Sequence, residues 1–414
     1  MTNIQRIIDA LSDELARPTA VDDANFRLLF YSPQHGPLDE VRLTSILHRD
    51  APAAAKDWVR AQGVSDAVGV DRLGRAPEVG LLPRAYAPIR HAGTLLGYLW
   101  IIDADESLSP AQDQRIASVA TELGPLLYRR RTLDLLDREH EREALLELLS
   151  DDAQQRAHAA ERLRRGGTLA TATSIHVVVV EALVAAGDPF DDGERLALET
   201  TLERVRGRVA EPDIAHLCQG PRGAVFVAGQ PFRAGEADLR SFARDLGDAC
   251  RRSLPGRRVV TAVGSARSTL VDAWGSHREA LVTCRMLARV PDLGDVLAHA
   301  DLGPYTVLAQ LPDAALTPDL VPAPLRALLD ADVEGVLVQT LECFLDMAGD
   351  AARAARHLHV HRSTIYSRLH RVEAVTGCAV EDGRDRLQLH LGLAVARAVG
   401  LWPRDQPAAR AASD

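Results

Sequence analysis

Residues 349–371 read GDAARAARHLHVHRSTIYSRLHR, and this stretch predicts two short helices joined by a tight turn. Asp350 is a suitable N-cap for the first helix, and residues 359–361 form the turn. Apolar residues recur at helical spacing in both segments, with small alanines in the first. They are Ala351, Ala354, Ala355 and Leu358, then Ile365, Leu369, Val372 and Thr376. Small side chains allow the second helix, which starts at Arg362, to cross the first closely, as a helix-turn-helix requires.

The same stretch is strongly basic within an acidic chain. It holds five arginines (353, 356, 362, 368 and 371) against one carboxylate, Asp350, while the whole chain has a formal net charge of −10. A basic helical pair on an acidic protein is typical of a surface that binds the phosphate backbone of a nucleic acid.

The second helix resembles a known recognition helix. Residues 360–365, VHRSTI, followed by Arg368-Leu369, are similar to the "vHRNTlxYRL" pattern of the PucR/CdaR-type transcriptional regulators. The resemblance continues through residues 371–373, 376–377 and 385–389, and it extends back to residues 337–341. Ser363 stands where the family prefers Asn, and the tyrosine is displaced to 366, with Ser367 after it. The resemblance implies a helix-turn-helix DNA-binding domain over residues 330–402.

This resemblance suggests roles for the polar side chains. Base edges in the major groove are reached from the N-terminal end of a recognition helix, which here carries His361, Arg362, Ser363, Thr364, Tyr366 and Ser367. Arg362 could pair bidentately with a guanine. Four arginines are better placed for phosphates: Arg353, Arg356, Arg368 and Arg371. One such domain makes few contacts, so we expect a homodimer that reads two half-sites about one helical turn apart.

A metal site is the rival interpretation of this stretch. His357, His359 and His361 form an HxHxH pattern, with His370 nearby. That spacing places all three on one face of a strand, but not across a helix end and a turn. No acid or cysteine is close enough in sequence to complete a tetrahedral set, so we expect no metal.

Composition limits the other possibilities. A chain of 414 residues has room for two to four domains, and no apolar run approaches the roughly 18 residues of a membrane span. The N-terminus lacks a signal-peptide pattern. Five cysteines are scattered without a CxxC pair, which favours a reducing cytoplasm and argues against disulfides and zinc. The single lysine, Lys56, leaves phosphate contacts to arginine.

Residues 1–150 predict an α+β domain with a long exit helix. The expected elements are a helix at 4–15, a strand at 26–31, a helix at 53–62, strands at 84–90 and 95–102, and a helix from Ser109-Pro110 towards Leu149, with a charged break at 137–143. Their order is similar to the last half of a GAF-type sensory domain. That resemblance implies a cavity between sheet and helices, for which the candidates are Trp58, Arg84, Tyr86, Arg90 and Trp100. The alternative is that these are packing aromatics and surface arginines.

Residues 165–310 predict a β-α-β-β-α-β order, as in the ferredoxin-like core shared with nucleotide cyclases. Residues 262–287, AVGSARSTLVDAWGSHREALVTCRML, are similar to the GGDEF-like middle domain of the same regulators. A working cyclase needs metal-binding carboxylates, yet the hairpin at 220–225 has none, and Glu181 is a lone carboxylate that we expect to be solvated or paired. We therefore expect a structural or dimerising module without catalysis or cofactor.

The last hundred residues complete the expected plan. Residues 313–324 read as a proline-rich linker, and residues 337–345 as an apolar helix. A final helix with apolar residues from Leu387 to Val395 is expected to be largely buried, and residues 403–414 to be a disordered tail.

The prediction is a multidomain α/β and all-α chain that acts as a cytoplasmic, ligand-responsive, one-component transcriptional regulator. Two alternatives stay open. The first is a diverged nucleotide cyclase or nucleotide-binding signalling protein. The second is an interaction scaffold whose helical pair no longer touches DNA.

Overall fold

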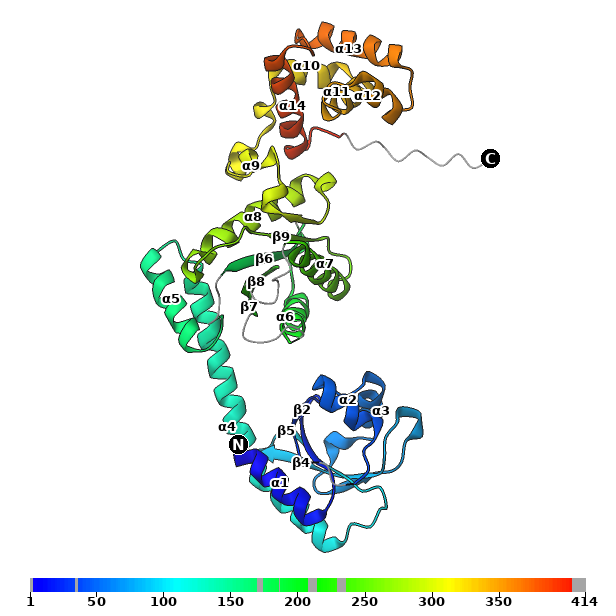
Figure 1. Cartoon of the computed structure of the whole chain (residues 1–414), viewed down its shortest axis with the longest axis vertical. Coiled ribbons are helices and arrows are strands. Elements are labelled where there is room, and N and C mark those ends of the chain that lie inside the picture. Colours follow the sequence, from blue (N-terminus) through cyan, green and yellow to red (C-terminus); the bar gives the residue numbers. More distant parts are fainter. Residues whose placement is uncertain are drawn as a thin grey trace, which may run out of the picture. The chain divides into compact units, whose positions relative to one another are not determined.

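The computed structural model describes residues 3–33, 36–169, 174–185, 187–207, 214–228 and 236–403. The chain divides into two units, residues 1–139 and 140–414 (Figure 1). None of the helices in the described ranges combines the length and the apolar character that a membrane span requires.

The first unit is built on one antiparallel sheet with the strand order β2-β1-β5-β4-β3. Its elements are α1 (Asn3–Leu15), β1 (Thr19–Asp23), β2 (Leu28–Tyr31), α2 (Glu40–His48), α3 (Ala53–Ala61), β3 (Asp71–Leu73), β4 (Arg84–His91), β5 (Thr94–Ile102) and α4 (Pro110–Leu148). The predicted turn between β4 and β5 is confirmed: Ala92 and Gly93 both adopt positive φ angles, 47° and 81°. Strands β1 and β3 and helix α2 were not predicted.

Each face of this sheet packs on a different set of helices (Figure 1). Val21, Ala87 and Leu99 face a core shared with α1 and α4. Gly124 allows α4 to approach closely, because a Cβ at this position would lie 2.4 Å from the carbonyl oxygen of Arg90. The opposite face carries mainly aromatic side chains, which pack with residues of α2 and α3: Phe26, Tyr86, Tyr98 and Trp100.

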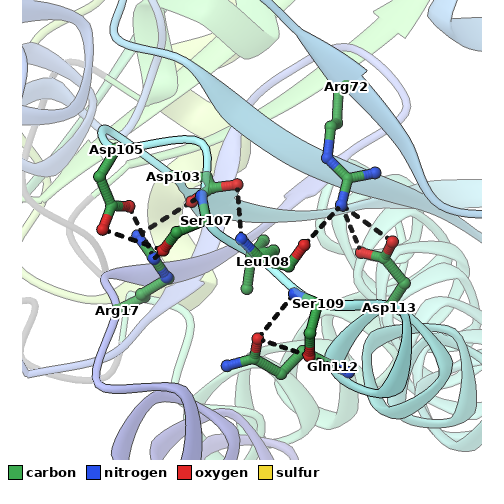
Figure 2. A network of polar contacts seen from close by, with 9 residues as sticks. All are labelled: Arg17, Arg72, Asp103, Asp105, Ser107, Leu108, Ser109, Gln112 and Asp113. Atoms are coloured by element: carbon green, nitrogen blue, oxygen red, sulfur yellow. Dashed lines mark hydrogen bonds and ion pairs between the residues drawn. The ribbon is translucent and has the colours of Figure 1, made fainter.

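A network of polar contacts fixes the chain where it enters α4 (Figure 2). Ser109 and Gln112 form a capping box: the Ser109 amide donates to Gln112 Oε1 at 2.8 Å, and the Gln112 amide donates to Ser109 Oγ at 3.4 Å. Arg17 pairs with Asp103 at 3.0 Å, and Arg72 pairs with Asp113 at 2.9 Å. The predicted start of this helix, with Ser109 before it and Pro110 first, is thereby confirmed.

Helix α4 is uninterrupted from Pro110 to Leu148 and so begins in the first unit and ends in the second. The charged segment at 137–143 does not break it, because glutamate and arginine are themselves good helix formers. Leu133, Leu135 and Leu136 are half-exposed along its middle.

The second unit begins with a five-stranded sheet of order β10-β9-β6-β8-β7. Its elements are α5 (Ala153–Arg165), β6 (Ile175–Ala182), α6 (Asp192–Arg206), β7 (Ile214–Gln219), β8 (Arg222–Ala228), α7 (Glu236–Ser253), β9 (Val259–Val263), α8 (Ala273–Arg289) and β10 (Val296–Ala298). The predicted β-α-β-β-α-β order is present. Strand β10, which pairs parallel to β9, was not predicted because it has only three residues.

This sheet separates two cores. Val177 and Val179 of β6 face α5 and α8, whereas Val178 and Val180 face α6 and α7. The expected pairing of Glu181 is confirmed, because it forms an ion pair with Arg222 at 2.8 Å.

The remaining helices form one cluster with a common core (Figure 1). They are α9 (Tyr305–Leu308), α10 (Ala323–Ala331), α11 (Val336–Asp346), α12 (Ala351–His357), α13 (Arg362–Thr376) and α14 (Gly383–Ala398). The expected linker is partly helical, since it holds two 3₁₀ turns (Asp313–Ala315 and Pro318–Leu320) and the start of α10.

The prediction that the last helix is buried around most of its circumference is wrong. Leu387 is 68% exposed and Leu391 is 41% exposed. These two residues are one helical turn apart, so they share the solvent face of α14, while Leu389 and Leu393 face the core. The predicted disordered tail, apart from Pro403, lies outside the described residues.

Candidate nucleic-acid interface and ligand cavity

Helix α12 begins at the predicted N-cap. Asp350 Oδ1 accepts hydrogen bonds from the amides of Ala352 at 2.9 Å and Arg353 at 3.0 Å. The bond from the Arg353 amide contributes most to holding the pKa of Asp350 below its usual value. The N-terminal cap of α12 is therefore an ionised carboxylate that accepts two backbone hydrogen bonds.

The turn between α12 and α13 is tight. The amide of Leu358 donates to the Ala354 carbonyl at 2.9 Å, and that of Val360 donates to the Ala355 carbonyl at 3.0 Å. His359 between them has a left-handed φ of 53°. Ala354 and Ala355 are buried, which is the close packing that the alanines predicted.

Helix α13 begins at Arg362, as predicted, with His361 as its N-cap. The Ser363 amide donates to His361 Nδ1 at 3.3 Å, and the Ser363 hydroxyl lies 2.7 Å from the same nitrogen. The buried residues of α13 are the four predicted for its inner face: Ile365, Leu369, Val372 and Thr376. They pack α13 against α10, α11 and α12.

The first turns of α13 present a polar face to solvent. His361, Arg362, Ser363, Tyr366 and Ser367 are exposed, and Thr364 is half-buried. Arg362 Nη2 donates to the Tyr366 hydroxyl at 2.8 Å, and the guanidinium carbon lies 5.4 Å from the centre of the tyrosine ring. The Arg362 side chain therefore follows the helix surface to its neighbour one turn on.

The four arginines assigned to phosphates do not share one environment. Arg353, Arg356 and Arg371 are exposed, and their guanidinium groups make no hydrogen bond or ion pair within the part of the chain that the structure describes. Arg353 and Arg356 also line a shallow depression of about 500 Å³ together with Met347, His357 and His359. Arg368 is half-buried, and its Nη1 donates to Thr340 Oγ1 at 3.2 Å, so it contacts α11.

The histidines are spread over different elements. His357 ends α12, His359 occupies the turn and His361 caps α13, while His370 pairs with Glu373 at 3.3 Å. Within the described ranges, no three histidine, cysteine, aspartate or glutamate side chains are grouped so that they could hold a metal ion.

The first unit contains a cavity of about 30 Å³ between the aromatic face of its sheet and helices α2 and α3. Of the five residues predicted for a ligand pocket, Arg84 and Trp100 line it. Tyr86 lies beneath, with its ring centre 5.3 Å from that of Trp100, and its hydroxyl donates to Asp71 at 3.2 Å. Trp58 is half-buried against the same cluster, and Arg90 is exposed and donates to the Ser65 carbonyl at 2.7 Å.

The sequence did not single out the other polar residues of this cavity. They are Asp22 on β1 and Arg42, Ser45 and Lys56 on the two helices. Asp39, which caps α2, was the available signal. A helix that begins after this aspartate places Arg42 and Ser45, three residues apart, on the same side.

Burial changes the titration of these groups. It raises the pKa of Asp22 to about 6, although Arg42 and Arg84 act in the opposite direction. It lowers the pKa of Arg42 to about 10, with Asp22 opposing the shift. Arg84 is 6% exposed and is paired with Asp39, which also accepts from the Leu82 amide at 2.9 Å.

Comparisons with known proteins agree on the C-terminal helices. Residues 337–395 match the PucR C-terminal helix-turn-helix domain. The chain is 22% identical over 405 residues to the proline-responsive transcriptional activator PutR of Bacillus subtilis, covering 95% of this chain and 96% of the relative. It is 21% identical over 399 residues to the DNA-binding transcriptional activator AdeR of the same organism, covering 94% and 92%.

A solved structure is also similar at a low level. The crystal structure of a regulator of polyketide synthase expression from Bifidobacterium adolescentis is 18% identical, covers 63% of this chain and 98% of its own, and has a TM-score of 0.26, too low to indicate a shared arrangement. Helices α11–α14 thus carry a PucR-type C-terminal helix-turn-helix, and over nearly its whole length the chain is similar to two transcriptional activators.

Proposed function

We propose that helix α13 enters the major groove and that the exposed side chains of its first turns contact base edges. These are His361, Arg362, Ser363, Thr364, Tyr366 and Ser367. The observation that carries this assignment is the division of α13 into a buried side, on which Ile365 and Leu369 lie, and an exposed polar end. The N-terminal end of a recognition helix is the part that reaches base edges.

The phosphate contacts fall to Arg353, Arg356 and Arg371, whose guanidinium groups have no partner among the described residues. A guanidinium without an internal partner is available to bind phosphate bidentately. Arg368 was predicted to join them, but its hydrogen bond to Thr340 favours a role in positioning α13. Its remaining N–H donors are free for phosphate.

Equilibrium binding of the whole protein tests these roles. The DNA is the region upstream of its own gene and, in parallel, a random duplex, each at several salt concentrations. Arg362→Ala should weaken specific binding by about 1–3 kcal/mol and leave random binding nearly unchanged. Arg353→Ala and Arg356→Ala should weaken both and lower the salt slope by about one each. Arg164→Ala, an exposed arginine of α5, is the charge-matched control. Equal losses on both duplexes for Arg362→Ala would reject the base-reading role, and binding to neither duplex would favour the scaffold alternative.

The rest of the chain regulates this domain. We assign residues 1–150 to a GAF-like sensor, 165–310 to a ferredoxin-like, GGDEF-like module and 330–402 to the DNA-binding domain. The name of the proline-responsive relative supports a small-molecule effector, and the names of both relatives support activation of transcription. The protein works as a cytoplasmic homodimer on two half-sites, and half-site spacing in a footprint tests this assembly.

A nucleotide-directed function of the middle module is the second candidate. A depression of about 280 Å³ between α6 and α7 contains Arg204 and Arg252, which could hold phosphates, but it has no carboxylate for a metal. Glu181 is paired with Arg222, and the hairpin from Gly220 to Val225 contains no acid. We therefore expect no turnover of GTP or ATP with Mg²⁺, and product formation above the background of a purified Arg252→Ala variant would revive this candidate.

A further inference from the structure

Two side chains of opposite charge line the cavity of the first unit, and neither has a hydrogen-bonded or ion-paired partner among the described residues. Arg42 is 5% exposed, and neither its guanidinium nor the Asp22 carboxylate makes a hydrogen bond or ion pair with any residue in the described ranges. Both line the same cavity, and after burial each is the strongest influence on the pKa of the other.

The other charges of the cavity are already satisfied. Arg84 is paired with Asp39, and Lys56 is paired with Asp50. The cavity therefore presents one free cation and one free anion among the described residues. Desolvating a charge without a partner is unfavourable, and a ligand that supplies both complementary charges removes this penalty at once.

The remaining lining is apolar and aromatic. Phe26, Val41, Val59 and Leu81 form the walls, with Trp100 on the sheet side. The Nε1–H of Trp100 is buried and has no hydrogen-bond partner. A buried donor without a partner is uncommon in native proteins, and it marks a place where a ligand oxygen or an ordered water completes the site.

We infer that this cavity is the effector site and that it takes a small zwitterion, an α-amino or α-imino acid, with its carboxylate on Arg42 and its ammonium on Asp22. The apolar walls receive the hydrocarbon part of the ligand. The space is only about 30 Å³, so the hydrocarbon part must be short and the smallest members of this class should bind best. This inference rests on the proposed function, which requires a small-molecule effector.

The test measures ligand binding to the full-length protein by calorimetry, with the twenty standard L-amino acids as probes. L-Alanine is matched by L-lactate, which lacks the ammonium, and by ethylamine, which lacks the carboxylate. The variants are Arg42→Gln and Asp22→Asn, with Arg75→Ala and Glu78→Gln as exposed controls in the same unit. Circular dichroism and the melting temperature without ligand show whether each variant folds.

We expect at least one amino acid to bind, and the single-group analogues to bind at least tenfold more weakly. Arg42→Gln and Asp22→Asn should each lower amino-acid affinity at least tenfold, whereas the exposed controls should not. Asp22→Asn should not weaken lactate binding, because lactate has no ammonium for Asp22 to hold. If either variant does not fold, the matched alanine, lactate and ethylamine series on the wild-type protein decides the ligand class by itself.

Binding of none of the twenty amino acids overturns the inference, as does unchanged affinity in the folded variants. Failure of the proposed function is separate and is measured on DNA. An amino acid that alters operator binding equally in wild type, Arg42→Gln and Asp22→Asn would leave the sensor role intact and reject this site. Loss of all operator binding by the wild-type protein would reject the proposed function whatever the calorimetry gives.

Discussion

The Arg362 guanidinium rests on the ring of Tyr366, with Nη2 donating to the tyrosine hydroxyl at 2.8 Å. The residue that we propose to read a base is therefore already restrained along α13 before DNA is present. Restraint of a long side chain in the free protein lowers the entropy that must be lost on binding.

Tyr366→Phe separates the two parts of this restraint. The ring contact with Arg362 is kept and the hydroxyl is lost, so we expect specific DNA binding to weaken by about 0.5–1.5 kcal/mol, the usual contribution of one hydrogen bond. In a double-mutant cycle on the operator, Tyr366→Phe should have no further effect once Arg362 is alanine. Additive losses would indicate that the hydroxyl contacts DNA by itself.

Arg368 and Thr340 form a second pair, which joins α13 to α11. We expect Arg368→Ala and Thr340→Val each to lower the free energy of unfolding by about 1 kcal/mol. The double variant should lose little more than either single variant, because both remove the same hydrogen bond. Urea unfolding of the two single variants and the double variant gives the coupling. Arg371→Ala, an exposed arginine one turn on, is the control and should leave stability unchanged.

Asp350 makes the stability of α12 depend on pH. Its folded pKa lies below its ordinary value because the amides of Arg353 and Ala352 donate to the carboxylate. This stabilisation is present above the unfolded pKa of about 4 and is lost as the pH falls through the lower folded value. Asp350→Ala should reduce the melting temperature at pH 7 and have a smaller effect at pH 3, whereas Asp350→Asn should retain part of the cap. An equal effect at both pH values would contradict this role.

Glu342 on α11 holds the end of α14. Arg397 Nε donates to Glu342 Oε1 at 2.7 Å, and Trp402 Nε1 donates to Oε2 at 3.0 Å. The hydrogen bond with Glu342 is the main reason that the pKa of Arg397 is raised. Glu342→Gln should lower stability by about 1.5–3 kcal/mol, the range for hydrogen bonds to charged groups. Asp346→Asn on the same helix, where the side chain is 57% exposed in its pair with His390, should change it little. Similar losses for the two variants would show that burial does not decide the effect.

The helix-turn-helix was predictable because its signals are local. An aspartate cap, buried alanines and an apolar residue at every third or fourth position fix α12 and the start and inner face of α13 without reference to the rest of the chain. The same reasoning failed for α14, where a list of apolar residues did not reveal that Leu387 and Leu391 share an exposed side.

The ligand cavity was only partly predictable because its residues meet from distant elements. Strand alternation places Tyr86 and Trp100 on one face, but Asp22 comes from a short strand with two aspartates and Arg42 from a helix of nine residues that was not recognised. The pairing of β1 with β5 brings Asp22 to this cavity. The spacing of residues within one segment therefore could not predict that Asp22 and Arg42 line the same cavity.

The charge of Asp22 should make effector binding depend on pH, with opposite consequences for two classes of ligand. Burial raises the pKa of Asp22 to about 6, and the charged groups that act on it are Arg42, Arg84, Asp23 and Lys56. Because the folded pKa is above the unfolded value of about 4, the free protein loses stability as the pH rises through this window. A ligand ammonium group that binds the ionised Asp22 carboxylate restores this lost stability.

The expected result is that an amino acid raises the melting temperature more at pH 7.5 than at pH 5. For L-lactate, whose carboxylate is repelled by ionised Asp22, the shift should be no larger at pH 7.5 than at pH 5. In Asp22→Asn both ligands should lose this dependence, since no group at position 22 then titrates. The melting temperature of the full-length protein with and without each ligand, in buffers of equal ionic strength, measures the effect. Parallel behaviour of the amino acid and lactate across this range would mean that Asp22 does not face the ammonium.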